Sequence, residues 1–167
     1  LTPTVILKDS KPFLAISTPG GDSQDQQILN VLLNLLVFDM DLQAAIEAPR
    51  VASYSFPSSF APFEYFPGRL AVEGRIDAAT RAELSRRGHE VKEWPEWTWL
   101  AGSVEAVHAD PQRGLVSAGA DPRRPAYAIA GGNPAKVLRR RFSDEVVTEL
   151  VEIAWWDWSA EKISRNL

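Results

Sequence analysis

The chain has 167 residues and a formal net charge of −4 at pH 7. This length suits one domain of ordinary size with a substantial core, and the acidic balance argues against a nucleic-acid-binding protein, which needs a dominant basic face. The absence of cysteine excludes disulfides, thiolate metal sites and a cysteine nucleophile. No apolar run reaches the ~20 residues that span a bilayer, and no signal peptide is recognised, so a cytoplasmic location is favoured. Because the chain begins with Leu1, we expect proteolytic maturation, trimming or a fragment.

The first fifty residues predict a hairpin followed by two helices. Apolar runs at 5–7 and 13–16 flank a polar turn, which predicts a β-hairpin whose strands are buried on both faces. Apolar residues at spacings of three and four predict a helix over 23–36, with Asp22 or Ser23 as its N-cap. A second helix is predicted from 39–41 up to Pro49, which cannot continue it.

The middle of the chain alternates loops with short regular elements. Residues 52–68 are rich in Ser, Pro, Phe and Tyr and predict an irregular aromatic loop or an edge segment, followed by a strand at 70–73. Asp77 as N-cap and Gly88 beyond the C-terminus bound a predicted helix. We then expect extended chain at 89–94, and a second hairpin from 103–108 and 115–119.

The last residues predict a turn and helices. Gly-Gly-Asn-Pro at 131–134 predicts a turn. Ser143 and two acidic residues open a predicted helix that ends at the tryptophans of 155–158, and 159–166 predicts one more short helix.

The glycine pair Gly20–Gly21 stands between a predicted strand and a predicted helix. Without side chains, the amides of such a pair can approach a ligand closely, and the helix adds a positive dipole end. The pair can therefore bind an anion or stabilise an oxyanion in acyl transfer. A tight strand-to-helix turn explains the same two glycines without any chemistry.

Other candidate groups are better explained by structure than by chemistry. The two histidines, His89 and His108, have no partner that would make them catalytic, and Arg50 is expected to pair with a buried carboxylate. Trp94, Trp97 and Trp99 line a groove or, more simply, are buried in a core or interface. The aspartates interpreted as turn and cap residues are Asp77, Asp110 and Asp121.

Three ordered segments, 3–22, 40–50 and 119–124, resemble the small-subunit core of the γ-glutamyltranspeptidase family. The resemblance covers roughly residues 1–128. It implies an N-terminal-nucleophile hydrolase fold, an αββα sandwich. It also implies self-cleavage into two subunits, a Thr nucleophile on the new N-terminus, and transfer or hydrolysis of γ-glutamyl groups such as that of glutathione.

By this resemblance, Gly20 and Gly21 match the family's oxyanion-hole glycines. The family's nucleophilic Thr and the residues that bind the substrate amino group and carboxylate lie upstream of Leu1. Thr2 and Thr4 lie inside the family's Pro-Thr strand segment and are no substitutes. The resemblance therefore implies a second chain that carries the Thr nucleophile and the carboxylate site, with γ-glutamyl small molecules as substrates. This chain alone has no cofactor by this interpretation.

The tail resembles a different family. Residues 131–142, and the continuation to 163, are similar to the end of the hexapeptide-repeat acetyltransferases that modify chloramphenicol or streptogramin-type antibiotics. This implies acetyl-CoA as the cofactor, with Asn133, Ala135 and Lys136 near it. A solvated basic turn explains Lys136 and its neighbouring arginines equally well. The chain has no hexapeptide repeats and no counterpart of that family's catalytic histidine.

We therefore expect an α+β fold: part of an αββα sandwich over residues 1–130, joined near Ala130 to a C-terminal helical tail over 131–167. Three functional hypotheses stay open. The chain is a γ-glutamyltranspeptidase-like segment that lacks its nucleophile, an acetyl-CoA-dependent acyltransferase element, or a non-catalytic fusion or interaction module.

Overall fold

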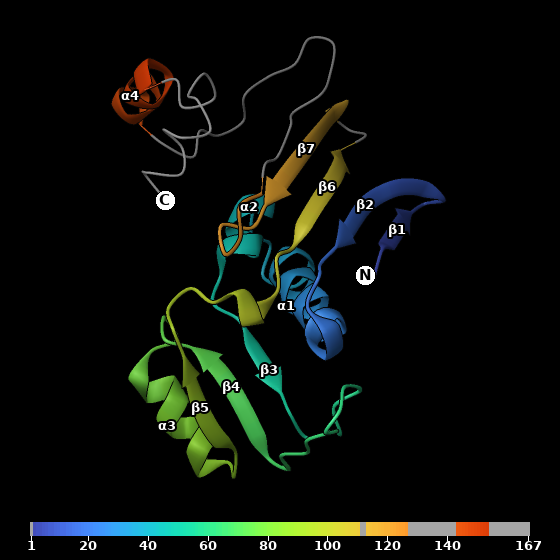
Figure 1. The fold of residues 1–167 in the computed structure, drawn as a ribbon. Coiled ribbons are helices and arrows are strands. Elements are labelled where there is room, and N and C mark those ends of the chain that lie inside the picture. Colours follow the sequence, from blue (N-terminus) through green and yellow to red (C-terminus); the bar gives the residue numbers. More distant parts are fainter. Residues whose placement is uncertain (1, 111–112, 127–142, 154–167) are drawn as a thin grey trace. The chain divides into compact units, whose positions relative to one another are not determined.

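A computed structural model describes residues 2–110, 113–126 and 143–153 of the chain (Figure 1). The chain divides into two compact units, residues 1–134 and residues 135–167. The described residues contain no helix long and apolar enough to cross a membrane. The architecture of the first unit is mixed α/β, with two separate sheets.

The larger sheet has four antiparallel strands in the order β1-β2-β6-β7. The strands are β1 (Thr4–Lys8), β2 (Lys11–Ser17), β6 (Glu105–Asp110) and β7 (Leu115–Ala120). Both predicted hairpins are therefore present. The pairing of Val5 with Ala15, of Ala15 with Val107 and of Val107 with Ala118 aligns one row of side chains on a single face.

The two faces of this sheet differ in burial, which corrects the prediction that the first hairpin is buried on both faces. Leu14 and Ile16 are buried on one face, whereas Val5 is 67% and Val107 45% exposed on the other. Alternation along antiparallel strands produces one buried and one open face. The prediction failed because Val5, Ile6 and Leu7 are all apolar, so composition hid the alternation.

Two helices cover the buried face: α1 (Gln24–Leu36) and α2 (Leu42–Glu47) (Figure 1). Both were predicted, and the Asp41 side chain accepts the Ala44 amide as the N-cap of α2. Helix α2 packs so closely on β7 that a Cβ at Gly119 would lie 2.6 Å from Ile46 Cδ1. The core side chains are Leu14, Ile16, Ile28, Val31, Leu42, Ala45, Ile46, Val104 and Ala106.

The smaller sheet consists of β3 (Val51–Ser53), β4 (Arg69–Glu73) and β5 (Glu90–Trp94). Strand β3 pairs antiparallel with β4, and β4 pairs parallel with β5. The parallel pair is connected by α3 (Ala78–Arg86), whose N-cap is Asp77 as predicted: its carboxylate accepts the Thr80 amide. Because this sheet buries mainly alanines and Trp94, its core is small.

The connection from the smaller sheet back to the larger one runs through the short 3-10 helix η2 (Trp99–Ala101). Ala101 and Val104, on either side of Gly102, are fully buried. A second 3-10 helix, η1 (Gly21–Ser23), leads into α1. The region between the two sheets thus contains the glycine pair, η2 and the ends of several strands.

In the second unit the structure describes one helix, α4 (Asp144–Ile153), at the place where Ser143 and the acidic pair predicted a helix start. The Ser143 hydroxyl accepts the Val146 amide. Val151 and Ile153 on this helix are half exposed within the described residues. The predicted turn at 131–134 and the predicted helix at 159–166 lie outside the described residues.

Candidate functional site

The glycine pair lies in the tight loop between β2 and α1. Gly20 has φ 145° and Gly21 has φ 59°, both in the region that side chains disfavour. The Ser23 hydroxyl donates to the Gly20 carbonyl (3.0 Å) instead of capping α1. The backbone therefore turns sharply between the strand and the helix, as the glycine pair predicted.

A second segment holds this loop in place. Thr18 is fully buried, and its hydroxyl oxygen accepts the Ser103 amide at 2.9 Å. Gly102 fits against it only because it has no side chain, since a Cβ there would lie 2.7 Å from Thr18 Oγ1. The loop is thus fixed between the two sheets before any ligand binds, as an oxyanion site requires.

The amides of the glycine pair are available for a ligand. Within the part of the chain that the structure describes, neither the Gly20 nor the Gly21 amide donates to a protein acceptor. Polar backbone groups in such loops normally find a partner in protein, water or ligand. Two adjacent unpaired donors on a rigid loop can stabilise a developing negative charge.

Next to the glycine pair, Asp22 connects the loop to the aromatic segment 54–68. The Asp22 carboxylate accepts the Ser59 amide (2.8 Å) and the Ser58 hydroxyl (3.1 Å). Hydrogen bonds from the Ser59 backbone and from Ser58 lower the pKa of Asp22 below its usual value. Phe60 lies over the glycine loop, because a Cβ at Gly21 would be 3.0 Å from its ring.

Residues 52–68 were predicted to form an irregular aromatic loop or an edge segment. Ala52 and Ser53 belong to the edge strand β3, and residues 54–68, called the aromatic loop, are irregular. Its own backbone bonds include Ser58 to the Glu64 carbonyl (2.8 Å) and Phe63 to the Phe60 carbonyl (2.7 Å). The Arg69 guanidinium stacks on Phe66, 3.7 Å from the ring centre. Four aromatic side chains of the loop remain at least 40% exposed: Phe56, Phe60, Phe63 and Tyr65.

Two adjoining pockets open beside the glycine pair. The larger, about 350 Å³, is lined by Thr2, Gly21, Asp22, Gln24, Asp25 and Phe56. The smaller, about 120 Å³, is lined by Asp22, Ser23, Gln26, Ala52, Ser53, Tyr54, Phe56, Ser58, Glu64 and Phe66. They share Asp22 and Phe56, so the aromatic loop forms a common wall.

A buried ion network lies at the other side of the junction between the sheets. Arg50 pairs with Asp121 at 2.7 Å, and Arg123 pairs with both Asp121 (3.1 Å) and Glu73, all with fully buried side chains. Arg75 also pairs with Glu73 at 3.0 Å. The prediction that Arg50 pairs with a buried carboxylate is confirmed. Asp121 is a turn residue as predicted, since its carboxylate accepts the Arg123 amide at 3.0 Å, and it also belongs to this buried network.

In this network, the carboxylates offset the unfavourable effect of burial on the charged arginines. Burial lowers the pKa of Arg50 to about 10, although Asp121 opposes the shift. Burial also disfavours the charge of Arg123, but the Glu73 and Asp121 carboxylates outweigh it and raise the pKa of Arg123. The backbone carbonyls of Ile46 and Ala101 accept hydrogen bonds from the Arg50 guanidinium, whose buried Nε has no hydrogen-bond partner within the described residues. The network satisfies its charges internally and so has a structural role.

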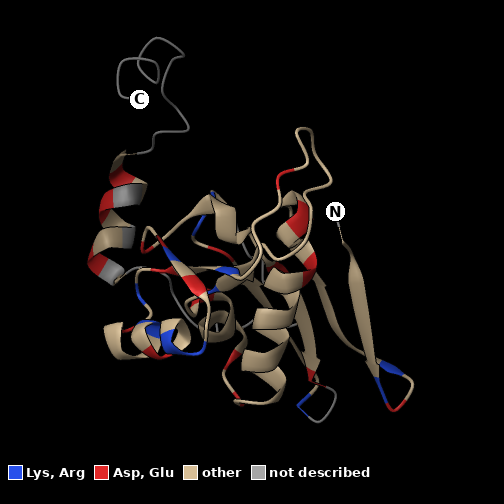
Figure 2. Cartoon of the chain, turned by 90° about the horizontal axis from the view of Figure 1, so that it is seen from below, with Lys and Arg blue, Asp and Glu red and all other residues tan. Residues whose placement is uncertain are grey.

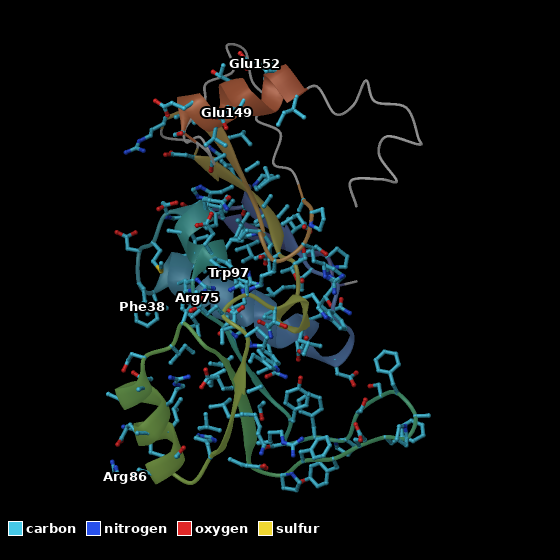
Figure 3. All side chains as sticks on the ribbon, turned by 60° about the vertical axis from the view of Figure 1, so that its left-hand side comes forward. Phe38, Arg75, Arg86, Trp97, Glu149 and Glu152 are labelled. Atoms are coloured by element: carbon cyan, nitrogen blue, oxygen red, sulfur yellow. The ribbon has the colours of Figure 1, made fainter. Side chains whose placement is uncertain are left out.

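Of the three tryptophans, Trp94 is in a core as predicted, whereas a groove or an interface stays a prediction for Trp97 and Trp99. Trp94 is buried, while Trp97 and Trp99 are 44% and 61% exposed. The Arg75 guanidinium lies over Trp97, 3.5 Å from the ring centre, and the two side chains appear together in Figure 3. Trp97 therefore shields the edge of the ion network from solvent.

The remaining residues predicted as candidates are the two histidines, which lie away from the glycine loop, and the expected CoA contacts. His89 is exposed beyond α3, and His108 packs edge-on against Phe13. Asn133, Ala135 and Lys136, the expected CoA contacts, lie outside the described residues. The described residues include no group of three or more acidic or histidine side chains able to hold a metal ion. Figure 2 shows acidic and basic residues together on α3 and only acidic ones on α4.

Sequence reasoning missed Asp22 as the anchor of the aromatic loop and Thr18 as the anchor of the glycine loop. Their partners, Ser59 and Ser103, are distant along the chain. The only available signal was the polar Ser-Ser pair amid the phenylalanines of 52–68, which predicts an ordered turn but not its acceptor.

Comparison with known proteins matches the gamma-glutamyltranspeptidase family model to residues 1–131. The glutathione hydrolase proenzyme of Bacillus subtilis is 28% identical over 129 residues, which cover 77% of this chain and 20% of that protein. A solved structure of LmbA2991HD is 44% identical with a TM-score of 0.69, over 72% of this chain and 21% of that one. The gamma-glutamyltranspeptidase of Helicobacter pylori is 26% identical with a TM-score of 0.61, over 74% and 60% respectively.

Acetyltransferases match as well. A chloramphenicol acetyltransferase of Escherichia coli is 33% identical over 151 residues, which cover 89% of this chain and 68% of that protein. Another, from Klebsiella aerogenes, is 38% identical over 112 residues. The chain spans half the length of the Klebsiella protein. Because the chain has 167 residues, the longer match overlaps residues 1–131.

Proposed function

The chain belongs to two families, the gamma-glutamyltranspeptidases through residues 1–131 and the chloramphenicol acetyltransferases, and from the first membership we propose that it is part of an acyl-transfer enzyme acting on γ-glutamyl compounds. The observation that carries the proposal is the pair of unpaired amides at Gly20 and Gly21, on a loop clamped by Thr18 beside a 350 Å³ pocket. In this proposal residues 1–130 form the hydrolase segment and residues 131–167 a separate acetyltransferase-like tail with helices.

The role of the glycine pair follows from the chemistry of acyl transfer. When a hydroxyl nucleophile adds to the γ-carbonyl carbon, the carbonyl oxygen becomes negative. The Gly20 and Gly21 amides then donate hydrogen bonds to that oxygen, and because Ser103 already fixes the loop, little reorganisation is needed. The amine leaves with a proton, and water or a second amine releases the acyl group.

The nucleophile is proposed to be a Thr at the N-terminus of a second chain, which also binds the substrate carboxylate. The open face of the large sheet supports such a partner. Val5, Val107 and Val116 are each at least 45% exposed there, within the described residues. A second layer over this face would bury them and complete a sandwich.

Cleavage of γ-glutamyl-p-nitroanilide by the purified protein, with any chain that accompanies it, tests this function. Gly20→Ala would place a side chain at φ 145° and shift both amides, so we expect kcat to fall about hundredfold. The matched control is Gly88→Ala, also at positive φ, where nothing lies within 4 Å of the added Cβ. Equal loss in both variants, or no cleavage by a sample that contains a Thr-initiated partner, contradicts the proposal.

A second function rests on the acetyltransferase relatives. In it, residues 131–167 contribute to an acetyl-CoA site, with Asn133, Ala135 and Lys136 near the cofactor. Calorimetric titration with acetyl-CoA tests it: Lys136→Ala should weaken binding, whereas Lys162→Ala, the other lysine of the tail, should not. Absence of saturable heat contradicts this second function.

A further inference from the structure

Building on the proposed acyl transfer, we propose that the two pockets beside the glycine loop bind the acyl acceptor, and that this acceptor is a primary amine with an aromatic or other apolar group and no carboxylate. The pockets adjoin the oxyanion-binding amides, because Gly21 itself lines the larger one. An amine held there lies next to the acyl carbon that the glycine pair would orient.

The charge of the lining selects for an amine. Asp22 and Asp25 line the larger pocket, and Asp22 and Glu64 line the smaller one, while neither lining includes a lysine or arginine. Asp22 uses one carboxylate oxygen, Oδ2, for both Ser58 and Ser59, so its Oδ1 can accept a bond from an ammonium group. Among the charged side chains that line these pockets, a ligand carboxylate would meet only like charge.

The aromatic side chains that line the pockets select for an apolar group. Phe56 contributes to both pockets and keeps 40% of its surface exposed. Tyr54 and Phe66 line the smaller pocket, and the Arg69 guanidinium on Phe66 holds that ring in position. An aromatic side group of the amine can stack on or against these rings.

The aromatic loop has a fixed position beside the glycine pair, because hydrogen bonds connect the two. Asp22 follows the glycine pair directly and anchors Ser58 and Ser59, while Phe60 contacts the position of Gly21. The aromatic loop and the oxyanion amides therefore keep a constant spacing. A loop tied in this way defines which acceptor reaches the acyl group.

The transfer step balances without any further reagent. The bound ammonium releases one proton to solvent, and the neutral nitrogen attacks the ester carbonyl carbon of the acylated nucleophile. The amide C–N bond forms, the ester C–O bond breaks, and the second proton of the attacking nitrogen passes to the nucleophile oxygen. The products are an N-acyl amine and the free hydroxyl.

Binding of 2-phenylethylamine to the full purified protein, measured by calorimetry or NMR titration, tests the acceptor site without requiring turnover. We expect saturable binding that is at least tenfold tighter than that of L-phenylalanine, which carries the same ring and amine plus a carboxylate. Phe56→Ala should weaken amine binding about fivefold. The control Phe38→Ala removes an exposed ring after α1, 68% accessible and labelled in Figure 3, and should leave it unchanged.

A charge-specific variant separates electrostatics from loss of folding. Asp25→Asn should weaken 2-phenylethylamine binding about threefold but leave the neutral analogue 2-phenylethanol unaffected. Asp39→Asn, an exposed aspartate outside the pockets, is its control. Equal affinity for amine and amino acid, equal effects of Phe56→Ala and Phe38→Ala, or no saturation would overturn the proposal.

The proposed acyl transfer and the proposed acceptor site can be tested separately. Hydrolysis of γ-glutamyl-p-nitroanilide without added amine reports on the proposed function alone. If hydrolysis is present but amine binding is absent, the acceptor assignment is overturned and the function stands. If amine binding is present but no cleavage occurs with a Thr-initiated partner, the acyl-transfer role is overturned and with it the acceptor role.

Discussion

The buried ion network and the aromatic loop place side chains in opposite ways. In the network, the charged side chains of Arg50, Asp121 and Arg123 are fully buried, whereas in the loop Phe60 and Phe63 are more than 60% exposed. Charges are usually outside and rings inside. The difference shows where each set of side chains finds its contacts. The charged groups of the network pair with one another inside the chain, whereas the exposed rings have surface available for a ligand or another chain.

The largest effect is expected where the network is broken. Arg123→Met leaves the Glu73 and Asp121 carboxylates buried with fewer partners, so the free energy of unfolding should fall by about 3–5 kcal/mol. Denaturant unfolding followed by circular dichroism measures it. The control is Arg87→Met at the exposed C-cap of α3, where a loss of less than about 1 kcal/mol is expected. If both variants lowered the free energy of unfolding equally, the network would not stabilise the fold.

The next largest effect on the free energy of unfolding is expected at Gly102, which packs against Thr18 beside the glycine loop. Gly102→Ala would bring a Cβ within 2.7 Å of Thr18 Oγ1 at φ 81°. We expect a loss of about 2–4 kcal/mol, from backbone strain together with overpacking. Gly114→Ala has a similar φ of 63° but open space around its Cβ, so it should lose only about 1–2 kcal/mol. Similar losses would show that the contact with Thr18 is unimportant.

A pH titration tests how the aromatic loop is attached. Because hydrogen bonds from Ser59 and Ser58 lower the pKa of Asp22, the attachment is complete above the ordinary value of 3.8 and is lost as the pH falls through the lower folded value. The Ser59 amide resonance in NMR spectra should therefore shift with a midpoint below 3.8. Asp22→Asn should abolish this midpoint; its persistence would assign the titration to another group.

The smallest effect is expected for the exposed rings themselves. Phe60→Ala removes a side chain that is 63% exposed, so the free energy of unfolding should change by less than about 0.5 kcal/mol. Thermal unfolding measures this. A loss comparable to that of Arg123→Met would mean that the loop supports the fold rather than an external ligand.

Local patterns predicted most of the elements. The helices α1, α2 and α3, the cap at Asp77 and both hairpins follow from periodicity and from capping and turn residues. These signals depend on neighbours within a few residues of each other. The same reasoning failed for the first hairpin, because whether a strand is covered on one face or two depends on what packs against it.

The candidate site was predictable only in its centre. Gly20 and Gly21 were identified from their position between strand and helix, and family resemblance suggested their role. Thr18, Ser103 and Gly102 were not identified, because the contact joins residues 85 positions apart. Asp22 and Ser59 likewise meet across 37 positions.

The amino-acid sequence alone thus determined the elements, the glycine turn, the absence of cysteine chemistry and the resemblance to two families. Tertiary structure decided which groups meet: Arg50 with Asp121, Thr18 with Ser103, and the aromatic loop with Asp22. The physical reason is the separation along the chain between the residues that interact. Turn and helix preferences are energies of adjacent residues, whereas burial, ion pairing and pocket shape arise only when distant segments displace water from one another.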